Sequence, residues 1–165
     1  MKQEPIQRIT DNDGTASRRV RLRTVSQKMI ADLGWLTGER LVEVVKRDHS
    51  WAFIFSGGGC IATEQAWRLV TNEGVAVASE DHGQPFGLLT PVDASARVLS
   101  ASKEQQVSAV RVVDQTGDLS VFFGSATRVE FLTLSCGYEG WRVTHGSSEL
   151  ICLGGGALHR NEKPG

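Results

Sequence analysis

The residues best suited to chemistry stand together in one polar stretch, Ser79 to Gln84. Glu80 and Asp81 precede His82, and two carboxylates beside an imidazole could perform acid-base chemistry or hold a metal ion. Neighbouring residues of an extended chain point in different directions, however, so these side chains converge only where the chain bends. We therefore interpret the stretch as a turn that caps a strand. No catalytic residue is assigned, and the candidates for binding a ligand or partner are Glu80, Asp81, His82 and Gln84.

A second cluster surrounds Tyr138 and Glu139, which stand between two glycines just before Trp141. Tyrosine and tryptophan near a carboxylate suit recognition of a ligand or a protein surface. The structural alternative is that Trp141 packs in the core while the two residues before it shape the start of a strand, and we favour this alternative. We expect Trp67 to be a core residue as well. Tyr138 and Glu139 are retained as hypothetical ligand- or partner-binding residues.

Other signals of chemistry are weak. The glycine triplets at 57–59 and 154–156 lack the lysine and hydroxyl of a phosphate-binding loop, so they indicate turns. The three cysteines, Cys60, Cys136 and Cys152, have neither metal-ligand spacing nor a pattern that marks a nucleophile. The sequence therefore predicts no metal, no cofactor and no covalent catalysis.

Charge and hydropathy narrow the classes of partner. The 165 residues carry 18 lysines and arginines against 19 aspartates and glutamates, a formal charge of -1, which selects neither nucleic acid nor an anionic membrane. The first residues lack the apolar stretch of a secretory signal, and no run approaches a membrane span. A cytoplasmic location is therefore expected.

The secondary-structure elements that would position these residues begin after a polar tail at residues 1–17. We expect one β-rich domain over residues 18–160, opening with the basic run Arg18 to Arg23, which reads as a solvated edge strand. Apolar residues at helical spacing from Val25 predict a short helix that ends at Gly34.

From Gly38 the apolar period changes to two, which indicates strands. Val42 and Val44 are placed on one face, as are Phe53 and Phe55 on the next strand. The alternation continues to about residue 80, and a similar region follows a predicted helix at about 92–103. The predicted fold class is α+β, mainly antiparallel β, with two related four-stranded meanders at about 38–80 and 106–156 and one or two short helices.

The two β regions resemble each other. Arg40 to Phe55 aligns with Ser108 to Phe123 without a gap, and Trp67 corresponds to Trp141 once an extra loop around residues 135–138 is allowed for. We interpret the likeness as an internal duplication in which each meander buries one apolar face against its sibling or a helix. The alternative is that any two half-buried hairpins share such alternation.

The chain also resembles a family of small bacterial proteins, common in actinobacteria, that is catalogued as a domain of unknown function. The matching segments lie between about residues 36 and 158, and the most specific of them run from Ser79 to Leu88 and from Gly137 to Trp141, followed by the late glycine triplet. The resemblance implies no assigned activity, so function has to be argued from the site.

We favour a non-enzymatic binding module whose partner is a protein or a small molecule. A toxin-neutralising immunity-type protein is one alternative, although an inhibitor of a basic nuclease is usually markedly acidic. A second alternative is an enzyme of unknown reaction that uses Glu80, Asp81 and His82 together with Glu139. A homodimer formed through an exposed strand edge is a third expectation.

Overall fold

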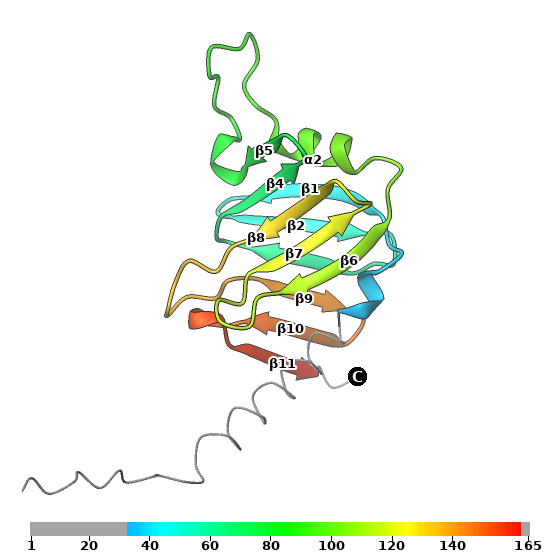
Figure 1. The fold of residues 1–165 in the computed structure, drawn as a ribbon. Helices are drawn as coiled ribbons and strands as arrows, with labels where there is room; N and C mark the ends of the chain where they lie inside the picture. Colours follow the sequence, from blue (N-terminus) through cyan, green and yellow to red (C-terminus); the bar gives the residue numbers. More distant parts are fainter. Residues whose placement is uncertain (1–32, 163–165) are drawn as a thin grey trace, which may run out of the picture.

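The computed structural model describes residues 33–162, and these form two antiparallel sheets that pack face to face (Figure 1). The six-stranded sheet has, in spatial order, β1 (Leu41–Arg47), β2 (Ser50–Phe55), β3 (Cys60–Thr63), β9 (Arg142–His145), β10 (Ser148–Cys152) and β11 (Leu158–Glu162). The five-stranded sheet has β5 (Gly74–Ala78), β4 (Trp67–Thr71), β8 (Thr127–Phe131), β7 (Leu119–Phe123) and β6 (Val107–Val112). The expected mainly antiparallel α+β class is confirmed.

Each half of the chain crosses from one sheet to the other. β1 to β3 form a three-stranded meander in the first sheet, and β4 and β5 then pair beside β8 in the second sheet. In the second half, β6 to β8 lie in the second sheet, and β9 and β10 return to pair beside β3. The expected four-stranded meanders are therefore not present as single sheets, because the chain changes layer after the third strand of each half.

The core lies between the sheets and is rich in aromatic rings. Trp67 meets Trp51 edge to face at 4.9 Å between ring centroids and Phe53 at 5.2 Å, while Phe53 meets Phe131 at 4.8 Å. Edge-to-face pairs contribute roughly 1 kcal/mol beyond the area that they bury. Trp67 and Trp141 are both completely buried, as the sequence predicted.

A β-bulge corrects the predicted face of the first strand. Leu41 pairs with Phe55 but Glu43 pairs with Ile54, so one residue of β1 is inserted into the ladder between them. Val42 is therefore 53% exposed, although the alternation placed it with Val44, which is only 5% exposed. An inserted residue shifts every side chain before it to the opposite face, and sequence alternation does not reveal the insertion.

The β6–β7 hairpin has a bulge at the same place. Val107 pairs with Phe123 and Ala109 pairs with Phe122, which matches the pattern of the β1–β2 hairpin. The strand pairing therefore places the first strands of the two hairpins two residues away from the ungapped alignment, because the chain from Val107 to Phe123 is two residues longer than the chain from Leu41 to Phe55.

The predicted helix at 92–103 is confirmed as α2 (Ala94–Ser102). It begins where the Asp93 carboxylate accepts a hydrogen bond from the Ala96 N–H at 3.0 Å, which satisfies one of the free amides of the first turn. Ala94 and Val98 are completely buried, and the helix packs against β1 with further contacts to β5 and β8. It thus closes one open side of the sandwich (Figure 1).

Short 3-10 turns complete the described chain: η1 (Gly34–Leu36), η2 (Ser79–Asp81) and η3 (Gly154–Gly156). The polar tail at 1–17, the basic run at 18–23 and most of the helix predicted from Val25 lie outside the described residues. The last strand, β11, was not predicted, because its polar sequence has no alternating apolar pattern. Within residues 33–162 no helix is both long and apolar enough to cross a membrane.

Candidate functional site

The first predicted cluster forms a connection between β5 and α2. Asp81 Oδ2 accepts a hydrogen bond from the Ala78 N–H at 2.8 Å, and the Ser79 hydroxyl donates to Glu80 Oε2 at 2.6 Å. His82 Nδ1 accepts from the Ala94 N–H at 3.2 Å. These side chains are thus engaged with neighbouring backbone and side-chain groups, as a strand-capping turn requires.

Two other contacts fix the same connection. The His82 ring lies edge-on to Trp51 at 5.2 Å, and its Nδ1 is 4.0 Å from the Asp93 carboxylate. The Gln84 backbone accepts a hydrogen bond from the Val92 N–H at 2.9 Å, while its side chain is exposed. The cluster therefore holds the chain on its path into α2.

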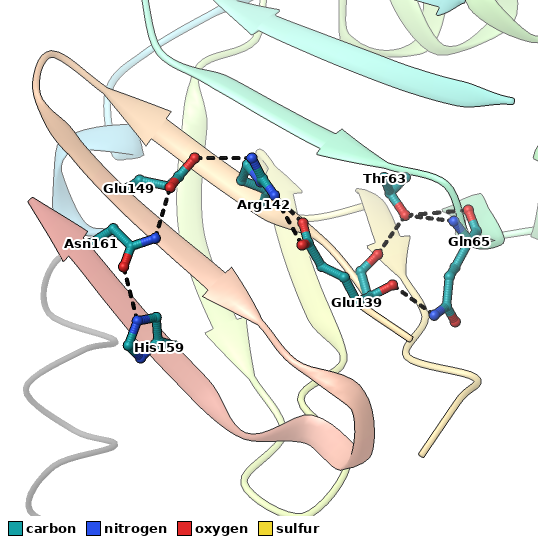
Figure 2. Close-up of polar contacts among 8 residues, drawn as sticks. Thr63, Gln65, Glu139, Arg142, Glu149, His159 and Asn161 are labelled. Atoms are coloured by element: carbon teal, nitrogen blue, oxygen red, sulfur yellow. Dashed lines mark hydrogen bonds and ion pairs between the residues drawn. The ribbon is translucent and has the colours of Figure 1, made fainter. Parts of the chain in front are cut away.

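The second cluster lies where the two chain crossings meet. The Thr63 hydroxyl donates to the Gly140 carbonyl at 2.7 Å. The Gln65 side chain donates to the Glu139 carbonyl at 2.8 Å (Figure 2). It also accepts a hydrogen bond from the Leu134 N–H at 2.7 Å. The short β3–β4 connection is thus bound to the longer β8–β9 connection by side-chain to backbone hydrogen bonds, which fix both loops.

Between these loops lies a groove of about 650 Å³, which we call the crossover groove. Its walls are Ser50 and Ala62 to Gln65 from the first half, and Leu134, Ser135, Tyr138 to Gly140 and Arg142 from the second. Tyr138 is 80% exposed, so its ring is free to contact a ligand. Glu80, Asp81, His82 and Gln84 do not line this groove, whereas Tyr138 and Glu139 do.

Arg142 is the cation of the crossover groove. Its guanidinium donates to both oxygens of Glu139 at 3.1 and 3.0 Å and lies 3.3 Å from Glu149, whose carboxylate is buried (Figure 2). The hydrogen bonds that Arg142 donates to Glu139 raise the pKa of Arg142, and Glu149 adds to this effect. Asn161 donates to Glu149 at 3.1 Å and contacts His159, so the network extends to β11.

The small side chain of Ala62 leaves room for the groove. Ala62 stands opposite Arg142 in the β3–β9 pair, so the cross-strand partner of this arginine on β3 has no carboxylate. In the other sheet Arg68 stands opposite Glu130 and donates to it at 2.6 Å. Burial opposes ionisation of Glu130, but hydrogen bonds from Arg128 and Arg68 outweigh burial and lower the pKa of that carboxyl.

The glycine triplet at η3 supports the wall of the groove. A Cβ atom at Gly154 would lie 2.6 Å from the Gly137 nitrogen, and one at Gly156 would lie 2.4 Å from the Thr116 carbonyl carbon. Only glycine allows the backbones to approach this closely. The triplet is therefore a packing feature that brings the end of β10 against the β8–β9 connection.

Two observations in the described part of the chain concern metal and thiol chemistry. Among residues 33–162 no three His, Cys, Asp or Glu side chains are grouped closely enough to hold a metal ion. Burial raises the pKa of Cys60 and of Cys152, which disfavours the reactive thiolate of each.

Sequence reasoning found Tyr138 and Glu139 but missed Ala62, Gln65 and Arg142 as parts of the site. The signal for Arg142 was present, because Trp67-Arg68 and Trp141-Arg142 are the same pair of residues at the start of corresponding strands. Only the strand pairing shows that one arginine faces Glu130 and the other faces alanine.

The chain matches no protein-family model, no curated protein and no solved structure. The family resemblance, the bacterial origin and the cytoplasmic location accordingly stay predictions.

Proposed function

We propose that this protein is a non-enzymatic binding module and that the crossover groove receives a cationic group, either a basic side chain of a partner protein or the amine of a small ligand. The observation that carries the proposal is the composition of the groove. An exposed tyrosine ring lies beside two carboxylates, Glu64 and Glu139, on loops that are hydrogen-bonded to each other.

Charge favours a cation over an anion. Among the described residues that line the groove, Arg142 is the one cation, and its guanidinium is already engaged by Glu139 and Glu149. Glu64 lines the groove in addition, so carboxylates outnumber cations. The face of the Tyr138 ring attracts an ammonium or guanidinium group, by about 0.5 to 1 kcal/mol at an exposed site.

The test uses Nα-acetyl-lysine methylamide and Nα-acetyl-glutamate methylamide as probes in an NMR titration. We expect the lysine probe to shift the backbone amides of Gln65, Ser135 and Tyr138, and the glutamate probe to leave them unchanged. Ala62→Lys places a second cation beside Arg142 in the groove, which should repel the lysine probe and abolish the shifts. Ser125→Lys adds the same charge on the exposed β7–β8 turn and serves as the matched control.

Two results would contradict the proposal. One is a preference for the glutamate probe, which would show that Arg142 dominates the groove. The other is an equal response of the Ala62→Lys and Ser125→Lys variants, which would show that the lysine probe binds elsewhere.

The enzyme alternative receives less support. It needs carboxylates of both predicted clusters in one pocket, and only Glu139 of the two clusters' acids lines the crossover groove. The toxin-neutralising alternative is one form of the binding proposal, because a locally acidic groove can match a basic partner even when the net charge of the whole chain is near zero. Capture of a basic protein by wild type but not by Ala62→Lys would favour it.

We also propose that the two halves arose by internal duplication. The order of β1, β2 and β3 beside β9 and β10 repeats as β6, β7 and β8 beside β4 and β5, so each half completes the sheet of the other with a hairpin. The shared bulge of the β1–β2 and β6–β7 hairpins is a second point of support.

Each of the two hairpins is also preceded by a matching backbone hydrogen bond. The Thr37 N–H donates to the Gly34 carbonyl at 3.1 Å, and the Lys103 N–H donates to the Ser100 carbonyl at 3.4 Å, each the same distance along the chain before its bulge. An experimental structure in which residues 33–78 fail to superpose on residues 99–151 would contradict the duplication.

A further inference from the structure

A loop between η2 and α2 projects beyond both sheets (Figure 1). We call residues 84–90 the apolar loop. Its base is fixed, because the Gly83 N–H donates to the Val92 carbonyl at 2.8 Å and the Val92 N–H donates to the Gln84 carbonyl at 2.9 Å. Within the tip, the Leu88 N–H donates to the Pro85 carbonyl at 2.6 Å. The loop is thus a closed turn held at its base.

The tip of the apolar loop presents large apolar side chains to water. Leu89 is fully exposed, Phe86 is 66% exposed, and Leu88 is about half exposed. Phe86 also has a positive φ of 39°, a conformation that bulky residues rarely adopt. Exposed apolar surface combined with backbone strain is typical of a contact site.

A groove of about 340 Å³ runs beside the same loop, between Leu88 and the exposed face of α2. Pro91, Val92 and Ala96 give it apolar walls, and Asp93 and Arg97 supply one charge of each sign. The projecting side chains and a receptive groove are therefore neighbours on one surface.

We propose that two copies of this chain associate through this surface, with Leu89 of each copy inserted into the loop–helix groove of the other. A two-fold axis makes both insertions at once, because the projecting residue and the groove belong to the same patch. The two copies carry a formal charge of only -1 each, so electrostatic repulsion between them is weak. The opposite charges of Asp93 and Arg97 also let the groove face a copy of itself.

The apolar loop is a better contact than the edge strand β5. β5 is an edge strand of the second sheet, but Arg97 Nη1 donates to the Ala76 carbonyl at 3.4 Å and covers the middle of that edge. Strand addition there would have to displace this side chain. Insertion of Leu89 needs no such change.

The size of the patch predicts a weak dimer. Three apolar side chains on each copy, at roughly 150 Å² each, give about 900 Å² in total, which is below the area of most stable interfaces. We therefore expect a dissociation constant in the micromolar range or weaker.

The test is sedimentation equilibrium of the full chain from about 1 μM to about 1 mM, which brackets the expected affinity. Wild type should rise from 17.9 kDa to twice that mass. Leu89→Asp should remain monomeric with an unchanged melting temperature, because the side chain touches solvent in the monomer. Val113→Asp adds the same charge at another exposed apolar residue, after β6, and should dimerise like wild type.

Four results would overturn the proposal. Wild type could remain at 17.9 kDa throughout the concentration range. Val113→Asp could fail to dimerise, as Leu89→Asp does. Val75→Lys on β5 could fail to dimerise while Leu89→Asp still forms the dimer, which would identify the strand edge as the contact. Finally, monomeric wild type could bind vesicles of phosphatidylcholine and phosphatidylglycerol in a Leu89-dependent manner, which would identify a lipid surface.

Discussion

The chain crosses between the two sheets at two places, and each crossing carries a Trp-Arg pair. The arginine of each pair faces a different residue on the neighbouring strand. At the β4–β8 pair, Arg68, which follows Trp67, stands opposite Glu130, and the two side chains form a tight ion pair. At the β3–β9 pair, Arg142, which follows Trp141, stands opposite Ala62, and its guanidinium forms ion pairs with Glu139 and Glu149 instead.

This difference explains how a groove can form at the β3–β9 pair, whereas an ion pair covers the same place at the β4–β8 pair. An alanine stands where the other sheet has a carboxylate, and the connection before β9 is longer than the one before β4. The longer connection supplies Leu134 and Tyr138 as a wall. No change of fold is required, because the backbone pairing at the two places is the same.

The largest difference in the free energy of unfolding should come from substitution of the two buried tryptophans. Trp141 Nε1 donates to the Gly117 carbonyl at 2.7 Å, whereas Trp67 Nε1 has no hydrogen-bond partner within the described residues. Trp141→Phe leaves the Gly117 carbonyl with only the weak Cys152 thiol at 3.7 Å, but Trp67→Phe removes an unsatisfied donor. We expect Trp141→Phe to be the more destabilising by about 2 kcal/mol in urea unfolding. Equal losses would show that the Trp67 N–H is satisfied in solution.

The next effect should come from Glu130, which lies between Arg68 and Arg128. Glu130→Gln should lower the free energy of unfolding at pH 7 by about 1 kcal/mol, since both arginines are partly exposed and screened by solvent. Glu139→Gln at the other crossing is the matched control and should cost less, because Glu139 is the more exposed carboxylate.

The same variant should change the pH dependence of stability. The lowered pKa of Glu130 in the fold means that its contribution is complete above the unfolded value of about 4.3 and is lost as pH falls through the folded value. Wild type should therefore lose more stability than Glu130→Gln between pH 6 and pH 3, as measured by thermal unfolding at each pH. Parallel losses would contradict the ion-pair account.

A smaller effect should follow when the missing carboxylate is restored. Ala62→Glu should form a new pair with Arg142, and a double-mutant cycle with Arg142→Gln should give a coupling energy of about 0.5 kcal/mol. A coupling of zero would mean that Glu139 and Glu149 retain the guanidinium.

The smallest effect should be that of Glu139→Gln on stability, below about 0.5 kcal/mol because this pair is exposed to solvent. The same variant should nevertheless weaken binding of the lysine probe several-fold in the NMR titration. Unchanged probe affinity would remove Glu139 from the site.

Much of the local structure could be predicted from the sequence. The alternation around Phe53 and Phe55, the glycine turn after them and the helix that begins after Asp93 each follow from residues adjacent in the chain. The burial of both tryptophans was also predictable, since large apolar rings dominate cores. β11 escaped prediction because its stability comes from pairing with β10, not from an apolar face.

The candidate site was predictable only in part. Tyr138 and Glu139 stood out by residue type, but Ala62 and Gln65 carry no chemical signal of their own. They became parts of a groove because residues about 75 positions apart meet where the two crossings touch.

By itself, the sequence determined most of the strands, the helix that begins after Asp93 and which rings enter the core, because alternation, helix capping and ring size can each be read from a short stretch of residues. The tertiary structure decided which sheet each hairpin joins, where the bulges shift a face, and that Arg142 meets an alanine. Those outcomes depend on pairing between distant segments, and alternation along one strand contains no information about its partner.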